Sequence, residues 1–156
     1  MQTLEELIGV APVFAGLVPE HLALIAGCGR NNRVEAGAFL LREGDPANRF
    51  FLIRRGRVAL EVHAPGRAAL RIETLQVGDV VGWSWLFEPF RWQLDGRTIE
   101  PCELIEFDGA CLRGKCDTDH ELGYQLMRRF ARNIVDRLQA TRLQLLDVYG
   151  DAPARV

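Results

Sequence analysis

The sequence is poor in several residue types, and each shortage argues against a class of function. Lysine occurs once, at Lys115, among 19 basic residues, and the net charge of -2 is not that of a chain built to coat nucleic acid or an anionic membrane. Histidine occurs only at His21, His63 and His120, too scattered for the clustered histidines of metal-dependent barrel enzymes. Glycine-rich phosphate loops and serine nucleophile elbows are lacking as well. We therefore expect no catalytic residues, no metal and no enzymatic activity.

Long apolar runs are also lacking. None approaches the ~20 residues that a membrane helix needs, and the first six residues are acidic where a secretory signal is basic. We therefore expect a cytoplasmic protein with no membrane association. The four cysteines, Cys28, Cys102, Cys111 and Cys116, are then expected to be reduced, as buried or idle thiols. The spacing of the last two matches no common zinc motif.

The 156 residues fit one domain and divide into three zones. Residues 1–29 predict short helices, the first with a capping box formed by Thr3 and Glu6, the second opened by Pro19. Residues 33–108 change to short apolar runs separated by glycines, which indicates an all-β sandwich or barrel. The expected strands lie at 39–41, 50–53, 58–62, 70–75, 79–81 and 102–107, with a hairpin tip at 64–67.

Residues 117–149 predict one long helix, which we expect to start at a second capping box formed by Thr118 and Glu121. Apolar positions then recur at alternating spacings of three and four, which is typical of a dimerising coiled coil. This seam consists of Tyr124, Met127, Ala131, Ile134, Leu138, Thr141, Leu145 and Val148. A second stripe, Leu122, Leu126 and Phe130, predicts that the first half packs on the barrel and the second half on a partner helix. A helix buried wholly within its own chain is the alternative.

Charge along this helix indicates a solvated face. Five arginines, Arg128, Arg129, Arg132, Arg137 and Arg142, alternate with Glu121, Asp136 and Asp147. The seven residues after the helix, 150–156, form a polar tail with no helix-turn-helix. We therefore expect no direct DNA binding.

Three motifs make the chain resemble a known family. They are FAGL at 14–17, GAFLLREGD at 37–45 and FFLIRRGRV at 50–58. In this order they resemble the cyclic nucleotide-binding domain of the Crp–Fnr or catabolite activator type. The resemblance implies a mainly β fold with flanking helices: a jelly-roll β-barrel with N-terminal helices over 1–116, then a long C-terminal dimerisation helix over 117–149. It also implies a ligand pocket inside the barrel and a homodimer.

The pocket departs from the family pattern. Family members carry a phosphate-binding cassette, in which a Gly-Glu opens a short helix and an Arg-Ser/Thr follows about ten residues later; backbone amides and the arginine hold the cyclic phosphate. Here Gly82 is retained but Trp83 replaces the glutamate, and Trp92 and Gln93 replace the Arg-Ser/Thr pair. Arg91 and Arg97 both lie at positions that point to the opposite face of a regular strand. Either could reach in through a bulge, or both are solvated.

The candidate ligand-binding residues are therefore Gly82, Trp83, Ser84, Trp85, Arg91, Trp92 and Arg97. The three tryptophans form either an aromatic box for a planar ligand or core that fills the old pocket. A cyclic nucleotide is the ligand of the family, but the altered cassette argues against it, and no other cofactor is expected. Our leading hypothesis is a regulatory sensor that binds a small ligand and signals through its dimer helix to an unidentified partner protein. The alternative is a ligand-free dimeric interaction module whose pocket is filled by tryptophans.

Overall fold

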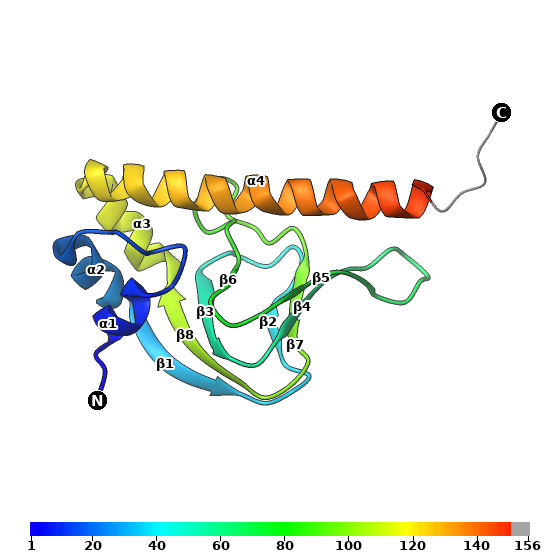
Figure 1. The fold of residues 1–156 in the computed structure, drawn as a ribbon, viewed down its shortest axis with the longest axis horizontal. Coiled ribbons are helices and arrows are strands. Elements are labelled where there is room, and N and C mark those ends of the chain that lie inside the picture. Colours follow the sequence, from blue (N-terminus) through cyan, green and yellow to red (C-terminus); the bar gives the residue numbers. More distant parts are fainter. Residues whose placement is uncertain (151–156) are drawn as a thin grey trace.

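The computed structural model describes the backbone of residues 1–150 and the side chains of residues 1–147. Val148 of the seam and the tail after Gly150 therefore lie outside the described part. Eight strands form two antiparallel four-stranded sheets in the orders β1-β8-β3-β6 and β2-β7-β4-β5 (Figure 1). The elements are α1 (Leu4–Gly9), α2 (Pro19–Ala26), β1 (Gly29–Val34), β2 (Phe39–Leu41), β3 (Arg49–Arg55), β4 (Val58–Val62), β5 (Leu70–Leu75), β6 (Val80–Val81), β7 (Asp95–Thr98), β8 (Cys102–Asp108), α3 (Gly109–Thr118) and α4 (His120–Gly150).

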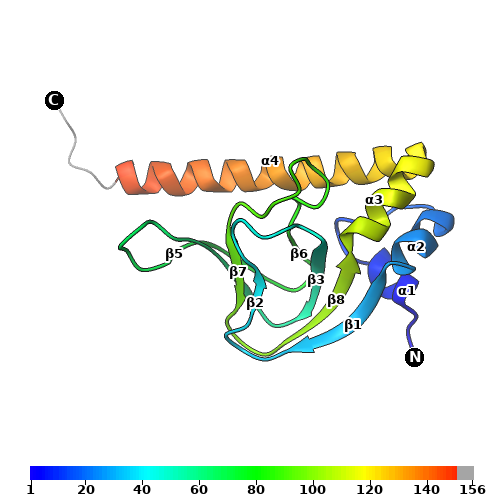
Figure 2. The ribbon, with the colours of Figure 1, turned by 180° about the vertical axis from the view of Figure 1, so that it is seen from behind.

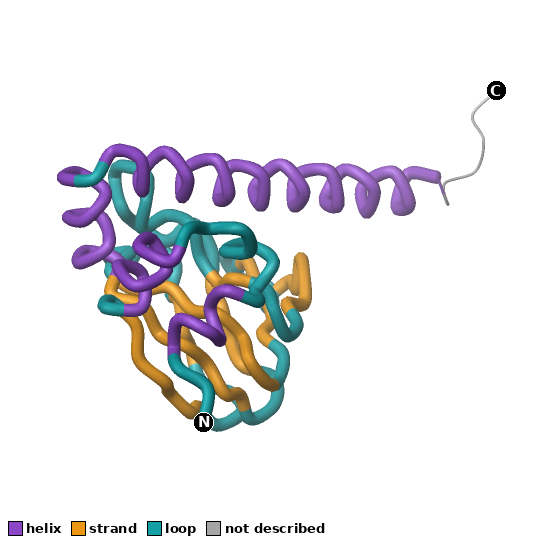
Figure 3. The backbone as a smooth tube through the Cα atoms, turned by 60° about the vertical axis from the view of Figure 1, so that its left-hand side comes forward, coloured by secondary structure: helices purple, strands orange, loops and turns teal. Residues whose placement is uncertain are grey.

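The jelly-roll prediction is confirmed, and helices flank the two sheets. In Figure 1 the short helices lie at one end of the barrel and α4 runs along its length. The tube view of Figure 3 shows the last turns of α4 extending past the strands. The capping box predicted at Thr3 is formed: its hydroxyl accepts from the backbone N–H of Glu6, whose carboxylate accepts from the Thr3 N–H.

Two strands were not predicted, because both are polar. In β7, Asp95 accepts the backbone N–H of Glu43 at 2.7 Å, and Thr98 donates to the Glu35 carbonyl at 2.6 Å. These side chains are buried but hydrogen-bonded, so the strand needs no apolar alternation. β1 has Gly-Arg-Asn-Asn-Arg-Val as its sequence and lies at the edge of its sheet, paired only with β8.

The first half of α4 packs on the barrel as the second apolar stripe predicts. Leu122, Leu126 and Phe130 are all fully buried. The Phe130 ring meets the Trp85 ring edge-on at 5.3 Å, and Trp85 in turn stacks on Phe50 with 4.4 Å between ring centroids. Aromatic pairs of this geometry each contribute roughly 0.5–1.5 kcal/mol beyond their area burial, so this cluster fixes α4 against the first sheet.

The predicted start of the long helix is wrong in detail. Residues up to Thr118 belong to the separate helix α3, which sequence reasoning missed, and α4 begins at His120. Asp119 lies between them in an extended conformation and accepts the backbone N–H of Leu122 at 3.1 Å, so aspartate and not Thr118 caps α4. The Thr118 hydroxyl instead donates back to the Lys115 carbonyl at 3.2 Å.

The expectation of four reduced cysteines is also corrected. Cys28 and Cys111 form a disulfide, with their Cα atoms 6.0 Å apart. A tertiary contact brings the two cysteines together: the Cys28 carbonyl accepts from the Asp108 N–H at 2.8 Å, which places the start of α3 beside the end of α2. Cys102 and Cys116 are free thiols. None of the helices in the described residues combines the length and the apolarity that crossing a membrane requires.

Candidate functional site

The candidate site lies where the segment after β6 turns between the two sheets and passes beneath α4. Gly82 starts this segment with a φ of 99°, a conformation that side chains other than glycine rarely adopt. The indole of Trp92 lies directly against it, because a Cβ built at residue 82 would meet Cη2 of that ring at 2.6 Å. Gly82 is therefore needed both for its backbone conformation and for the close approach of Trp92.

The indole of Trp92 is buried beside the cavity that remains between the sheets. Trp92 is 6% exposed, and the cavity that remains has a volume of about 30 Å³. Its walls include Leu41, Leu60, Val80 and Arg137. A cavity needs roughly 10–15 Å³ of such space to hold one water molecule, whereas ligand pockets hold about 300–1,000 Å³. The described conformation therefore has no room for a nucleotide at this position.

The structure brings four of the seven predicted site residues to this cavity and separates three from it. Gly82, Trp83, Ser84 and Trp92 line it, and Ser84 is nearly buried. Trp85 instead belongs to the aromatic core beneath α4, where its ring stacks on Phe50.

The two candidate arginines do not line the cavity. Arg91 is exposed and donates to the Gly44 carbonyl at 3.1 Å. Arg97, on β7, makes a bidentate ion pair with Glu61 of β4, with both N–O distances 2.9 Å. Hydrogen bonding to Arg97 lowers the pKa of the Glu61 carboxyl, and the same contact raises the pKa of Arg97. Gly96, next to it, faces Leu41 and Val81 inside the barrel, so Arg97 points outward as strand alternation predicts.

Arg137 is the cavity residue that sequence reasoning missed. Placing it on a solvated face was wrong, because it is only 9% exposed. Its Nη1 donates to Glu73 of β5 at 2.7 Å, and its Nη2 donates to the Val80 carbonyl of β6 at 3.4 Å. Its guanidinium carbon lies 5.5 Å from the centre of the Trp83 ring. The sequence did contain evidence that Arg137 faces the barrel, because it lies seven residues after the buried Phe130 and therefore on the same face of the helix.

Arg137 therefore connects three parts of the molecule. Glu73 belongs to one sheet, Val80 to the other, and Arg137 itself to α4. Its Nε is buried without a hydrogen-bond partner in the described residues. We call the contacts of Arg137 with Glu73 and Val80 the latch. Figure 2, which views the molecule from behind, shows α4 running along one side of the barrel.

The predicted seam is exposed along the described part of α4. Tyr124, Leu138 and Leu145 are 56%, 50% and 56% exposed, and Ile134 is half-buried. Met127, Ala131 and Thr141 are also exposed, while the side chain of Val148 lies outside the described residues. The Thr141 hydroxyl donates to the Arg137 carbonyl at 2.9 Å, so its polar group is satisfied within its own helix. An exposed apolar stripe of this kind is typical of a surface that another chain covers.

Comparison with known proteins agrees with this architecture. The sequence profile of the cyclic nucleotide-binding domain matches residues 31–119. The CRP-like cAMP-activated global transcriptional regulator of Mycobacterium tuberculosis strain H37Rv is 26% identical over 154 residues, which are 98% of this chain and 67% of the regulator.

Solved structures show the same fold. A protein from Geobacter metallireducens GS-15, described as cyclic nucleotide-binding, has a TM-score of 0.79 at 26% identity, covering 88% of this chain and 99% of its own. A cyclic nucleotide-binding domain from Methylobacillus flagellatus KT has a TM-score of 0.78 over 99% of this chain and 85% of its own; at 16% identity this shows the fold alone. Because the family profile covers more than half of the sequence, the chain belongs to the cyclic nucleotide-binding domain family.

Proposed function

We propose that the chain is a homodimeric regulatory domain of this family whose nucleotide position is filled by Trp92 and whose output is carried by α4. The single observation behind this proposal is the cavity of about 30 Å³ that remains beside the Trp92 indole. The sequence of the cassette also supports this proposal, because Trp92 occupies the position of the phosphate-binding arginine of the family. Of the two functions considered from sequence, the ligand-free interaction module thus has the stronger geometric support.

The latch is the route by which the barrel and α4 influence one another. A displacement of β5 or β6 changes the distance from Arg137 to Glu73 or to Val80. Because the seam residues Ile134, Leu138 and Thr141 each lie within four residues of Arg137 on α4, such a displacement shifts the seam too. We therefore expect the state of the barrel and the geometry of the dimer to be coupled.

The dimer in this proposal is parallel, with Ile134, Leu138 and Leu145 at its centre and Thr141 weakening the seam while fixing its register. The same proposal divides the chain into a barrel unit and a dimer helix, with the boundary at Asp119 between α3 and α4 in place of the expected boundary between 116 and 117. Its partner is a second protein that recognises the dimer.

A small-molecule sensor is the second candidate, and one observation favours it. The buried guanidinium of Arg137 lies beside Trp83, and its Nε lacks a partner among the described residues. An anionic ligand that displaced the Trp92 indole would meet this cation. The ligand in that case is a small planar anion, and it need not be a cyclic nucleotide.

Light scattering of the full chain tests the proposed dimer. The double substitution of Ile134→Asp with Leu138→Asp places like charges in the seam, and we expect it to convert a dimer into a monomer. The matched control is Gln139→Asp with Leu143→Asp, on exposed positions about 140° and 180° around the helix from Ile134. This control should remain dimeric. A wild-type protein that is monomeric at tens of micromolar, or a control that dissociates equally, contradicts the proposal.

A further inference from the structure

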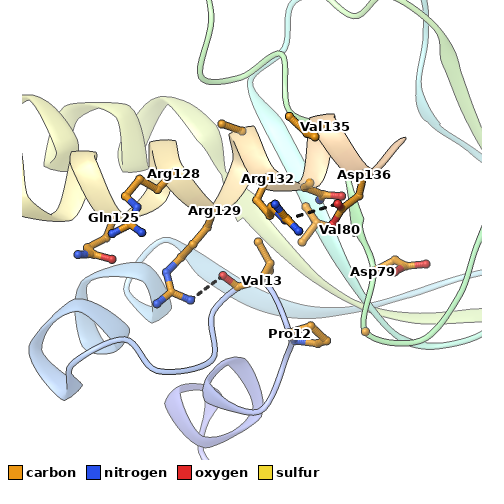
Figure 4. Close-up of a pocket in the computed structure, with 13 residues that line it drawn as sticks. Pro12, Val13, Asp79, Val80, Gln125, Arg128, Arg129, Arg132, Val135 and Asp136 are labelled. Atoms are coloured by element: carbon orange, nitrogen blue, oxygen red, sulfur yellow. Dashed lines mark hydrogen bonds and ion pairs between the residues drawn. The ribbon is translucent and has the colours of Figure 1, made fainter. Parts of the chain in front are cut away.

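A second groove lies along α4 beside the seam. It has a volume of about 760 Å³ and is bounded by α4, the loop after α1 and the turn between β5 and β6 (Figure 4). Pro12 and Val13 form one wall, and Asp79 and Val80 form another. This groove shares neither the tryptophans nor Arg137 with the site described above.

Helix geometry keeps the groove open in the proposed dimer. Arg132 and Asp136, which line the groove, are each two residues from Ile134, so they lie about 160° from it around the helix axis. A partner helix seated on Ile134 and Leu138 therefore leaves Arg132 and Asp136 open, while Arg128 and Val135, each four residues from a seam residue, lie at the border between the groove and the seam. Only Ala131 belongs both to the groove wall and to the seam.

The charge of the groove is positive and incompletely balanced. Arg132 pairs with Asp136 at 3.5 Å, and the Asp79 carboxylate accepts the backbone N–H of Gln76 at 2.8 Å. Arg128 has no carboxylate within ion-pair distance in the described residues; its guanidinium lies over the Tyr124 ring at 5.5 Å.

Arg129 is a second cation with no carboxylate partner among the described residues. Its Nη1 donates to the carbonyls of Val13 and Ala15 at 3.1 and 2.6 Å, and its Nε is buried without a partner in the described residues. Burial and the neighbouring Arg128 lower the pKa of Arg129, as expected for a cation that no acid stabilises. Figure 4 shows Arg128, Arg129 and Arg132 side by side along α4.

Small apolar side chains lie between these charges. Pro12, Val13, Ala131 and Val135 line the groove, and Val135 is 43% exposed. Next to Gly78 in the sequence, Val77 is exposed as well. A ligand that fits must therefore present both carboxylates and small aliphatic groups.

We propose that this groove is the docking site for an acidic segment of a partner protein, in which aspartate or glutamate side chains alternate with small aliphatic ones. The inference rests on the proposed regulatory function and names the chemistry of the partner. The acidic side chains pair with Arg128 and Arg132, and the aliphatic ones pack on Val13 and Val135. Docking here leaves the seam free, so one dimer binds two such segments.

Selection from a random peptide library displayed on phage, with the full-length dimer as bait, tests this inference. We expect enrichment of peptides rich in Asp, Glu and small aliphatic residues, and a fluorescent copy of the best peptide should bind with a saturable change in anisotropy. Arg128→Glu should weaken that binding at least tenfold, and raised salt should weaken it too. Arg67→Glu, an equal charge change on an exposed hairpin residue, should change it less than twofold.

Three outcomes overturn the inference: no enriched peptide, enrichment of basic or purely apolar peptides, or acidic peptides that bind Arg128→Glu as tightly as the wild type. If inorganic phosphate or acetate displaces the peptide at equal concentration, the groove is a simple anion site, which also overturns it. Light scattering, which measures whether the wild type is a dimer, distinguishes a failure of the groove proposal from a failure of the proposed dimeric function. A dimer that selects no acidic peptide refutes only the groove, whereas a monomeric wild type refutes the dimeric function.

Discussion

The Trp92 indole lies against Gly82 so closely that a single added methyl at residue 82 would stand 2.6 Å from its ring. The glycine that the family uses to approach a phosphate here admits an aromatic ring instead. This contact explains why only a small cavity remains inside a fold that belongs to the nucleotide-binding domains.

Gly82→Ala should destabilise the protein. The new Cβ meets the Trp92 ring, and the φ of 99° strains any side chain. Overpacking and strain of this kind together cost about 2–4 kcal/mol in the free energy of unfolding. Urea denaturation measures the loss. The control is Gly114→Ala in α3, where nothing lies within 4 Å of the added methyl and stability should stay equal or rise. Equal stability of the two variants would show that the close contact is not real.

Trp92→Ala should leave a cavity that free indole can enter. Loss of a buried tryptophan typically costs about 3–5 kcal/mol. Because engineered apolar cavities bind small aromatic molecules, millimolar indole should raise the melting temperature of Trp92→Ala and leave that of the wild type unchanged. Differential scanning fluorimetry with an external dye measures both. A variant as stable as the wild type, or one that indole does not stabilise, argues against a pocket filled by Trp92.

Removing the latch should destabilise the protein and loosen α4. Arg137→Ala deletes the hydrogen bonds to Glu73 and to the Val80 carbonyl, and we expect a loss of about 1.5–3 kcal/mol. Arg132→Ala removes an exposed pair with Asp136 and should cost less than about 0.5 kcal/mol. A double-mutant cycle of Arg137→Ala with Glu73→Gln isolates the pair itself. Strict additivity in that cycle would mean that the two side chains do not interact.

Stability should fall at alkaline pH through Cys116. Desolvation, with Asp117 and Asp119 nearby, raises the pKa of its thiol from 9.0 to about 11. The folded state thus favours the neutral thiol, so its contribution is fully present below the unfolded pKa and is lost as pH rises from about 9 to 11. Urea denaturation across this range, with Cys116→Ala as the variant, should show a shallower decline for the variant. Identical profiles would remove Cys116 as the cause.

Much of the fold was predictable from the sequence, because strands such as β3 and β4 carry apolar runs between glycines. β7 was not, since its buried Asp95 and Thr98 satisfy their polar groups through hydrogen bonds that only the tertiary structure supplies. Arg137 was missed for a related reason. A charged side chain is expected to face solvent, and only the fold shows that Glu73 of β5 lies where it can pair with the arginine. The disulfide could not be predicted from local pattern, because Cys28, just after α2, and Cys111, in α3, are 83 residues apart in the sequence.

Within the candidate site, the sequence identified the altered residues but not their geometry. The substitutions at Trp83 and Trp92 are visible in the motif itself. Whether Trp92 forms one wall of a box or fills the space depends on the distance between the sheets, which no local pattern encodes.

The most direct test of the filled pocket is the intrinsic fluorescence of the wild-type protein during titration with cyclic AMP. All three tryptophans lie between residues 83 and 92, so emission reports on this site without a label. With nucleotide absorbance corrected, the account predicts emission that stays flat to about 1 mM, because the remaining cavity is small and Trp92 stands at the arginine position of the cassette. A saturable change with a micromolar midpoint, abolished by Arg91→Ala or Arg97→Ala, would contradict it.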